Sequence, residues 1–298
     1  MSAITYGWDT DKKGSDAFWL RFDPCTRKPL AWKEELFAAA RVIANRAKKP
    51  IWICSSGGID SEIACRAFFD QGIHFSVLTL EHEGGTNTHD MNYALKWCKT
   101  RNVPHKIVKI DAVRFLTHDV EKYTDRYPAY HPFRYLQIYL MELVENMGGF
   151  GVLCSGEQLY QADLSKPILT RDDIFLPLSN GNCVPLEWCK NNTTDHEPYF
   201  HFSTPELCLS YLEIPIIDFA LSNPDPLFRH LGNAYALKRI AYQALWPDLE
   251  ARNKYHGFEN IRPLYDASTM QLRERFKQEY IPLNFPVTLF EKQLRGTI

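Results

Sequence analysis

The feature that most constrains the fold is a turn rich in serine and glycine between an apolar run and a helical pattern. The apolar run covers Pro50–Cys54, the turn reads Ser55-Ser56-Gly57-Gly58, and helical spacing follows from Asp60 to Gln71. Glycine permits a tight bend, and a helix that starts there presents unpaired N–H groups and the positive end of its dipole. The segment therefore predicts a strand, a turn and a helix start that together bind an anion such as phosphate.

The alternation of strand and helix continues after this turn. Gly72 ends the first helix, and apolar runs predict strands over 74–81 and 106–111, with a helix over 89–101 between them. A helix over 133–147 and a buried strand over 150–154 follow. Strands separated by helices of this length form right-handed βαβ units, so we expect an α/β fold with a parallel sheet.

The sequence divides into three parts on this pattern. Residues 1–49 contain an amphipathic helix expected to pack on the core, 50–164 form the α/β core, and 165–298 form a mainly helical region. Within the last part, Asn180-Gly181 lies between the apolar runs 174–178 and 183–188. This arrangement predicts a β-hairpin, whose prolines would keep its strands at an edge.

Composition excludes several classes of protein. The formal net charge of -2 disfavours binding of nucleic acid through bulk electrostatics, and no apolar run approaches the roughly 20 residues that span a bilayer. The eight cysteines include no Cys-x-x-Cys pair, which argues against a zinc ribbon, an iron–sulfur site and a redox pair. The polar N-terminus has no secretory pattern, so we expect a cytoplasmic protein with reduced thiols.

The turn and the residues after it resemble a known signature. Ser56-Gly57-Gly58-Ile59-Asp60-Ser61 is similar to the Ser-Gly-Gly-x-Asp-Ser motif of the N-type ATP pyrophosphatases, or PP-loop superfamily, and asparagine synthetase is the nearest member in character. The resemblance implies a doubly wound (HUP-like, adenine nucleotide alpha-hydrolase-like) fold with a five-stranded parallel sheet. It also implies ATP and Mg²⁺ as cofactors. The residues implied to bind ATP in the turn are Ser55, Ser56, Gly57, Gly58, Ile59, Asp60 and Ser61.

The same resemblance implies further site residues. Leu80 and Glu81, at the end of the second strand, would meet adenine. Asp60 and Glu157 would bind the metal, although the family usually has Asp-Glu where this chain has Glu157-Gln158, and Asp163 is a weaker candidate. Asp60 and Lys254 would be catalytic. The further basic residues Arg134, Lys238, Arg239 and Arg252 have surface positions as the competing interpretation.

The leading functional hypothesis is an AMP-forming ligase that adenylates an acceptor oxygen for attack by a nitrogen nucleophile. No glutaminase cysteine follows Met1, so the nitrogen would come from ammonia, an amine or a separate ammonia-supplying subunit. Two alternatives stay open: an inactive nucleotide-binding scaffold, and a PP-loop enzyme that modifies tRNA or a nucleobase. The acceptor would be a small molecule, no membrane partner is expected, and a homodimer is left open.

Overall fold

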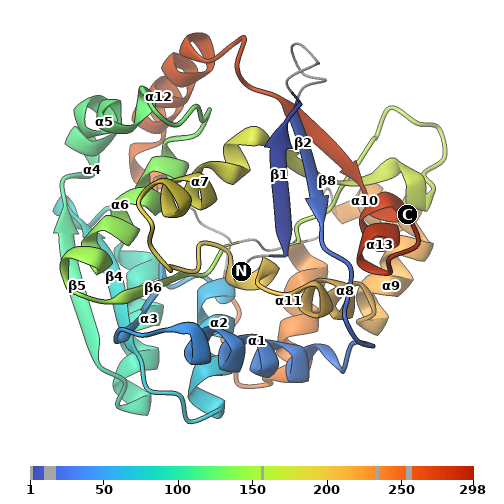
Figure 1. Cartoon of the computed structure of the whole chain (residues 1–298), viewed down its shortest axis with the longest axis horizontal. Helices are drawn as coiled ribbons and strands as arrows, with labels where there is room; N and C mark the ends of the chain where they lie inside the picture. Colours follow the sequence, from blue (N-terminus) through green and yellow to red (C-terminus); the bar gives the residue numbers. More distant parts are fainter. Residues whose placement is uncertain (1–2, 10–17, 156–157, 232–234, 253–256) are drawn as a thin grey trace.

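The computed structural model describes residues 3–9, 18–155, 158–231, 235–252 and 257–298. Figure 1 shows a parallel sheet with helices on one side of the molecule and a mainly helical region on the other, with an N-terminal hairpin between them. None of the helices in these ranges is long and apolar enough to cross a membrane.

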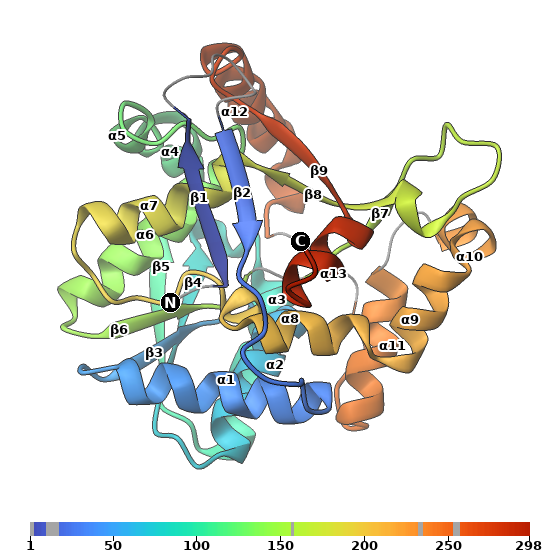
Figure 2. The same ribbon diagram turned by 45° about the vertical axis from the view of Figure 1, so that its right-hand side comes forward.

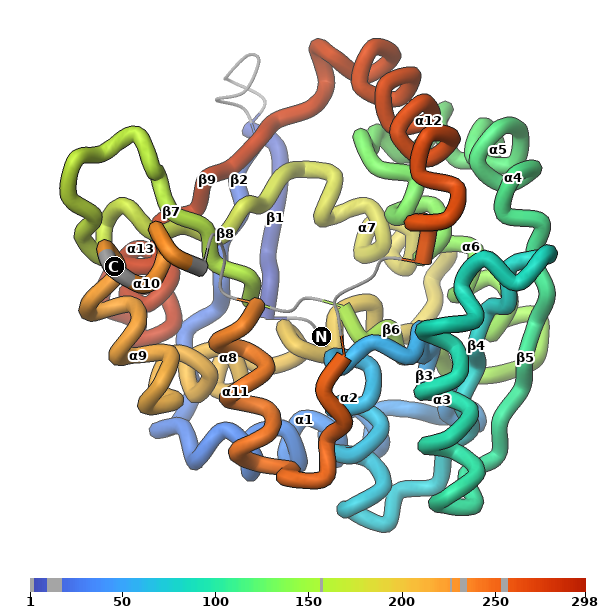
Figure 3. Tube along the Cα trace, turned by 180° about the vertical axis from the view of Figure 1, so that it is seen from behind, coloured from blue at the N-terminus to red at the C-terminus, as the bar shows by residue number. Residues whose placement is uncertain are grey.

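The predicted parallel sheet is present, with strands in the order β5-β4-β3-β6. The helices that follow β3 and β4, α2 and α3, lie on one face, and α6 lies on the other (Figures 1 and 3). The strand order therefore reverses at β3: the chain first adds β4 and β5 on one side of β3 and then returns to add β6, parallel to β3, on its other side. The elements of this part are β3 (Ile51–Cys54), α2 (Ile59–Asp70), β4 (Ser76–His82), α3 (Thr88–Arg101), β5 (His105–Ile110), α4 (Ala112–Arg114), α5 (Glu121–Thr124), α6 (Pro132–Asn146) and β6 (Phe150–Leu153).

The prediction of five strands is wrong, because the parallel sheet has four among the described residues. At the free edge of β6, where a fifth strand would lie, Val152 forms a single parallel bridge with Glu197. The Leu153 N–H donates to the Glu197 carbonyl over 2.8 Å, and the Glu197 N–H donates to the Gly151 carbonyl over 2.8 Å. The next N–H that would face β6, that of Tyr199, donates to the Glu197 side chain over 3.1 Å, so the pairing ends after one bridge.

The predicted hairpin over 174–188 is also wrong. The first run forms β8 (Ile174–Ser179) as expected, but β8 pairs antiparallel with β7 (Gln161–Ala162) and with the distant β9 (Pro282–Pro286). The second run forms the helix α7 (Val184–Asn191), which Pro185 opens in the first turn. Proline is well tolerated at a helix start, and the buried Val184, Pro185, Trp188 and Cys189 have helical spacing.

An N-terminal hairpin that we did not predict stands beside the second sheet. Strands β1 (Ile4–Trp8) and β2 (Phe18–Phe22) pair antiparallel, and Figure 2 shows them in front of β8. Phe22 packs edge-on against Phe285 of β9 and Phe290 of α13, with ring centroids 5.5 and 4.4 Å apart. The hairpin is therefore fixed to the C-terminal part of the chain.

Five of the remaining helices form the region on the other side of the hairpin: α8 (Pro205–Leu212), α9 (Pro215–Ser222), α10 (Pro224–Leu231), α11 (Tyr235–Leu245) and α13 (Val287–Leu294). The other two are α1 (Trp32–Arg46), which packs on α2, and α12 (Arg262–Arg275), which packs against α6. One buried cluster joins side chains from all three parts of the sequence, including Leu36 of α1, Ile53 of β3 and Phe290 of α13. Helix α11 lies close enough to α2 to reach the start of that helix with its side chains, as described next.

Candidate functional site

The Ser/Gly turn joins β3 to α2 where the sequence placed it. Gly57 has a φ of +88°, and a Cβ atom built on it would lie 1.9 Å from the carbonyl oxygen of Asp90 in α3. No side chain fits at this distance, and the left-handed φ itself disfavours other residues. The turn therefore packs directly on α3, and only glycine satisfies both conditions.

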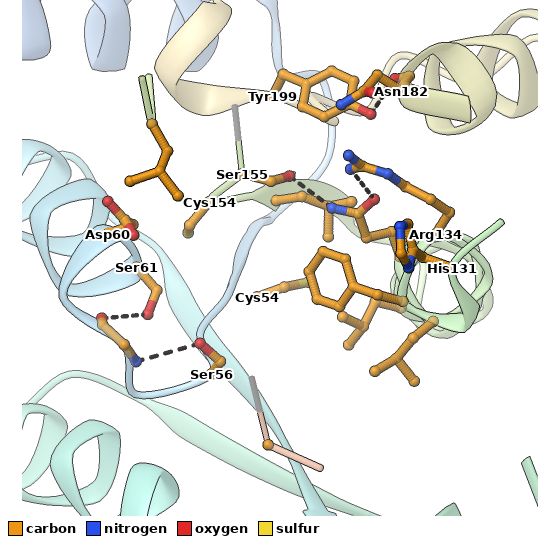
Figure 4. A pocket seen from close by; sticks show the side chains of 18 of the residues that line it. Cys54, Ser56, Asp60, Ser61, His131, Arg134, Cys154, Ser155, Asn182 and Tyr199 are labelled. Atoms are coloured by element: carbon orange, nitrogen blue, oxygen red, sulfur yellow. Dashed lines mark hydrogen bonds between the residues drawn. The ribbon is translucent and has the colours of Figure 1, made fainter. Parts of the chain in front are cut away.

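Hydrogen bonds within the turn hold its serines in place. The Ser55 hydroxyl lies 3.1 Å from the Ser61 hydroxyl, and the Ser61 hydroxyl donates to the Gly58 carbonyl over 2.8 Å. The Ser56 hydroxyl accepts weakly from the Gly58 N–H over 3.3 Å (Figure 4). Helix α2 begins after Gly58 with no side-chain cap, so its first N–H groups face the cavity without an internal acceptor. The arrangement suits an anion.

Asp60 in the first turn of α2 is bound by two side chains from α11. The Lys238 Nζ lies 2.8 Å from Oδ2, and the Tyr242 hydroxyl donates to Oδ1 over 2.8 Å. The Lys238 side chain is 0% exposed and that of Asp60 is 17% exposed. Burial of an ammonium costs desolvation free energy, which its contact with the carboxylate has to offset. Ionisable pairs held in this way at the edge of a cavity are typical of functional sites.

A magnesium ion fits this site only in part. Asp60 is the predicted ligand in the turn, and no group of three or more His, Cys, Asp or Glu side chains in the described ranges is placed to hold a metal. Mg²⁺ often takes one or two carboxylates and fills its other positions with water and substrate phosphate oxygens. Asp60 would serve as that carboxylate, and the Lys238 ammonium adds positive charge beside it. Glu157 and Lys254 lie outside the described residues.

A cavity of about 470 Å³ opens in front of the turn. Asp60, Ser56 and Ser61 stand on one side of it in Figure 4, and Arg134 and His131 on the opposite side. Ser155, at the end of β6, lies between them, so the cavity lies at the switch point between β3 and β6. Open α/β sheets bind their ligands at such a point, outside the carboxyl ends of the strands.

The end of β4 also reaches the cavity. Of the two residues expected to meet adenine, Leu80 lines the cavity and Glu81 does not. The Asn87 side chain binds the Leu80 carbonyl and the His82 N–H over 2.8 and 2.9 Å. Burial lowers the pKa of His82 to about 4, so its ring is neutral, and it lies 5.1 Å from the ring of Phe258. This end of the cavity offers flat, uncharged surfaces.

A buried ionic network anchors α2, the helix that follows the turn. Glu62 accepts from the Arg66 Nε over 2.8 Å and forms an ion pair with Arg252, whose guanidinium also lies 4.4 Å from the ring centroid of Tyr93. Arg66 in turn binds Asp248 at 2.7 Å. These contacts join α2 to the segment that precedes residue 253, and Gly257 and Phe258 beyond it line the cavity.

Three cysteines line the cavity, and none is activated. Burial raises the pKa of Cys54 to about 12 and raises those of Cys154 and Cys183 as well. A thiol rather than a thiolate therefore stands at each position, and the thiolate is the nucleophile in sulfur chemistry. None of the eight cysteines forms a disulfide.

Sequence reasoning missed several residues of this site. In the sequence Lys238 is one basic residue among several, and no pattern singles out Tyr242, Asp90 or Gln137. The signal for Lys238 is its place in α11, where Leu237, Lys238, Ala241 and Tyr242 form the buried stripe. A lysine at a buried position of a helical stripe needs a partner, and Tyr242 one turn later faces the same side. The sequence could therefore have indicated a pair, but not that Asp60 completes it.

The chain has no match among protein-family models or curated protein sequences. Among solved structures it is similar to NMN synthetase from Francisella tularensis, with 16% identity and a TM-score of 0.36, over 82% of this chain and 96% of that one. It is also similar to NH3-dependent NAD synthetase from Campylobacter jejuni (13%, 0.35, 83% and 94%). A third similarity is to the U34-tRNA thiolase NcsA from Methanococcus maripaludis (12%, 0.34, 76% and 83%). Similarities this distant decide neither fold nor function, so the conclusions below rest on the geometry.

Proposed function

We propose that this chain is an ATP pyrophosphatase-type enzyme, which cleaves ATP between the α and β phosphates and transfers the adenylyl group to an acceptor oxygen. The observation that carries the proposal is the Ser/Gly turn beside the buried Asp60–Lys238 pair. The turn offers uncapped helix N–H groups and serine hydroxyls, and Lys238 balances the negative charge of Asp60 beside them. Together they suit a phosphate group, and we assign the pyrophosphate part of ATP to them.

In the proposed reaction the acceptor oxygen attacks the α-phosphorus, and the bond from that phosphorus to the bridging oxygen of pyrophosphate breaks. Negative charge grows on the leaving pyrophosphate, which would lie against the turn. Backbone donors that are already in place stabilise such charge without reorganisation. Mg²⁺, when bound by Asp60 and the phosphates, would neutralise part of the same charge. A nitrogen nucleophile then displaces AMP from the adenylated acceptor.

The adenine would lie toward the end of β4. Leu80, the neutral His82 ring and Phe258 supply apolar and aromatic surface there, and Asn87 fixes the strand end. Because the Leu80 carbonyl already accepts from Asn87, stacking and apolar contact would contribute more than backbone hydrogen bonds. The acceptor would then occupy the opposite part of the cavity, near Ser155 and Arg134.

Two other functions are less well supported. Sulfur transfer to tRNA needs an activated thiol, and the cavity cysteines Cys54, Cys154 and Cys183 have pKa values raised by burial. An inactive scaffold remains the second candidate, because the Lys238 ammonium competes with a metal ion for Asp60.

The test is incubation of the full chain with α-labelled ATP and Mg²⁺, with a mixture of amino acids and ammonium as acceptor and nitrogen source. The proposal expects AMP and pyrophosphate in equal amounts, and an Asp60→Asn variant that still folds but releases none. Formation of ADP would contradict it. Tight binding of ATP without turnover, whichever acceptor is added, would support the inactive nucleotide-binding scaffold instead.

A further inference from the structure

Arg134 stands at the far wall of the cavity with a charge that the described part of the chain does not neutralise. It lies in the first turn of α6, is half-buried, and forms no ion pair with an acidic side chain in the ranges that the structure describes. The first turn of α6 carries no acidic residue either. Most other arginines near the site have such a partner, as Arg66 and Arg252 do with Glu62.

The guanidinium is held in place by a chain of hydrogen bonds. Its Nη1 donates over 3.1 Å to the Oε1 of Gln137, which is buried. The Gln137 Nε2 donates over 2.9 Å to the Ser155 hydroxyl, and that hydroxyl donates over 3.0 Å to the Pro198 carbonyl. The chain fixes the amide orientation and uses one guanidinium N–H, so the other donors of Arg134 can bind a ligand. Figure 4 shows the guanidinium inside the cavity wall, between Ser155 and Asn182.

Arg134 supplies the local charge at this end. Burial lowers the pKa of His131 to about 4, with Arg134 and Arg273 adding to the effect, so His131 is neutral at pH 7. Burial raises the pKa of Cys183 and Tyr265, and the Arg134 charge opposes both shifts. Its charge therefore acts on two other residues that line the cavity. The surrounding wall is otherwise largely apolar, with Leu140, Leu176 and Leu178 among its members.

We propose that Arg134 binds a carboxylate on the acceptor substrate, at the end remote from the oxygen that reacts, and that the acceptor has an apolar body between the two. A guanidinium presents paired donors that match the two oxygens of a carboxylate, and a half-buried site strengthens the pair. The apolar wall covers the body of the ligand, and the turn lies across the cavity from Arg134. Only the identification of the ligand as the acceptor substrate rests on the proposed function. The anion subsite itself follows from the geometry of the cavity.

The test is isothermal titration of the full chain with 3-phenylpropanoate and with its uncharged amide, 3-phenylpropanamide. We expect the acid to bind at least ten-fold more tightly than the amide, and Arg134→Gln to remove that preference. Arg114→Gln, which alters an arginine on α4 that is 69% exposed and outside the cavity wall, should leave both affinities unchanged. Binding of a non-hydrolysable ATP analogue should be the same in wild type and Arg134→Gln.

Three results would overturn the inference. The acid could bind no better than the amide, Arg134→Gln could leave the preference intact, or Arg134→Gln could weaken the ATP analogue as much as the acid. The last would assign Arg134 to the nucleotide. Formation of ADP from ATP, with the acid preference intact, would refute the proposed function and leave the anion subsite standing.

Discussion

The contact between the Ser/Gly turn and α3 can be tested with two glycine variants. Gly57 and Gly72 both have a left-handed φ, +88° and +63°. A Cβ atom on Gly72 would meet nothing within 4 Å, whereas one on Gly57 would lie 1.9 Å from the Asp90 carbonyl oxygen. Gly57→Ala and Gly72→Ala therefore have the same backbone penalty. Only Gly57→Ala also creates a collision with α3.

The magnitudes follow from that difference. The left-handed conformation costs a residue with a side chain about 1 kcal/mol, which is the whole expected loss for Gly72→Ala. At Gly57 the turn and α3 must also separate by roughly 1.5 Å to restore an ordinary contact, and overpacking of this kind adds about 2 kcal/mol. Because α3 buries Met91, Ala94, Trp97 and Cys98, it does not shift freely, and we expect the turn to move.

The assay is urea denaturation of both variants, with binding of a non-hydrolysable ATP analogue measured alongside. Gly57→Ala should lose about 3 kcal/mol and at least ten-fold in nucleotide affinity, and Gly72→Ala should lose about 1 kcal/mol with unchanged affinity. Equal stability and equal affinity in the two variants would refute the close packing of the turn on α3. Loss of stability alone, with full affinity, would refute the role of the turn in nucleotide binding.

Two other residues of the site give sharp predictions. Because Lys238 is fully buried against Asp60, Lys238→Met and Asp60→Asn should each cost about 3 kcal/mol, but the double variant about 4 rather than the sum; purely additive losses in a double-mutant cycle would contradict the pair. Burial raises the pKa of Asp90 to about 6, so the folded protein binds that proton more tightly than the unfolded chain, and the contribution of Asp90 to stability is greatest below about pH 4 and is lost as the pH rises through 6. Asp90→Asn should remove this fall and be about 2 kcal/mol more stable than wild type at pH 7; urea midpoints that change with pH alike in both proteins would count against it.

Local patterns in the sequence predicted the elements that carry the turn. The apolar run, the glycines and the helical spacing placed β3, the turn and α2 correctly, and the same rules placed β4, α3, β5, α6 and β6 within a few residues. Each of these elements is specified by residues next to one another. The five-strand expectation came from the resemblance and failed at the β6 edge, where the pairing with Glu197 ends after one bridge.

Pairings between distant residues could not be predicted in the same way. Ser179 of β8 pairs with Pro282 of β9, and Lys238 meets Asp60, which lies 178 residues earlier. No local pattern in either segment names its partner. The helix at Val184–Asn191 was mistaken for a strand because a proline and a short apolar run fit both a strand edge and a helix start. The contact of Lys238 with Asp60 could therefore be identified only from the folded structure.

The most direct test of the central claim is the identity of the products formed from ATP. The full chain, with Mg²⁺, α-labelled ATP, ammonium and a set of small carboxylic acids, should release AMP and pyrophosphate in a one-to-one ratio, and Asp60→Asn should release neither. Release of ADP and phosphate would contradict the claim that the Ser/Gly turn holds the pyrophosphate part of ATP.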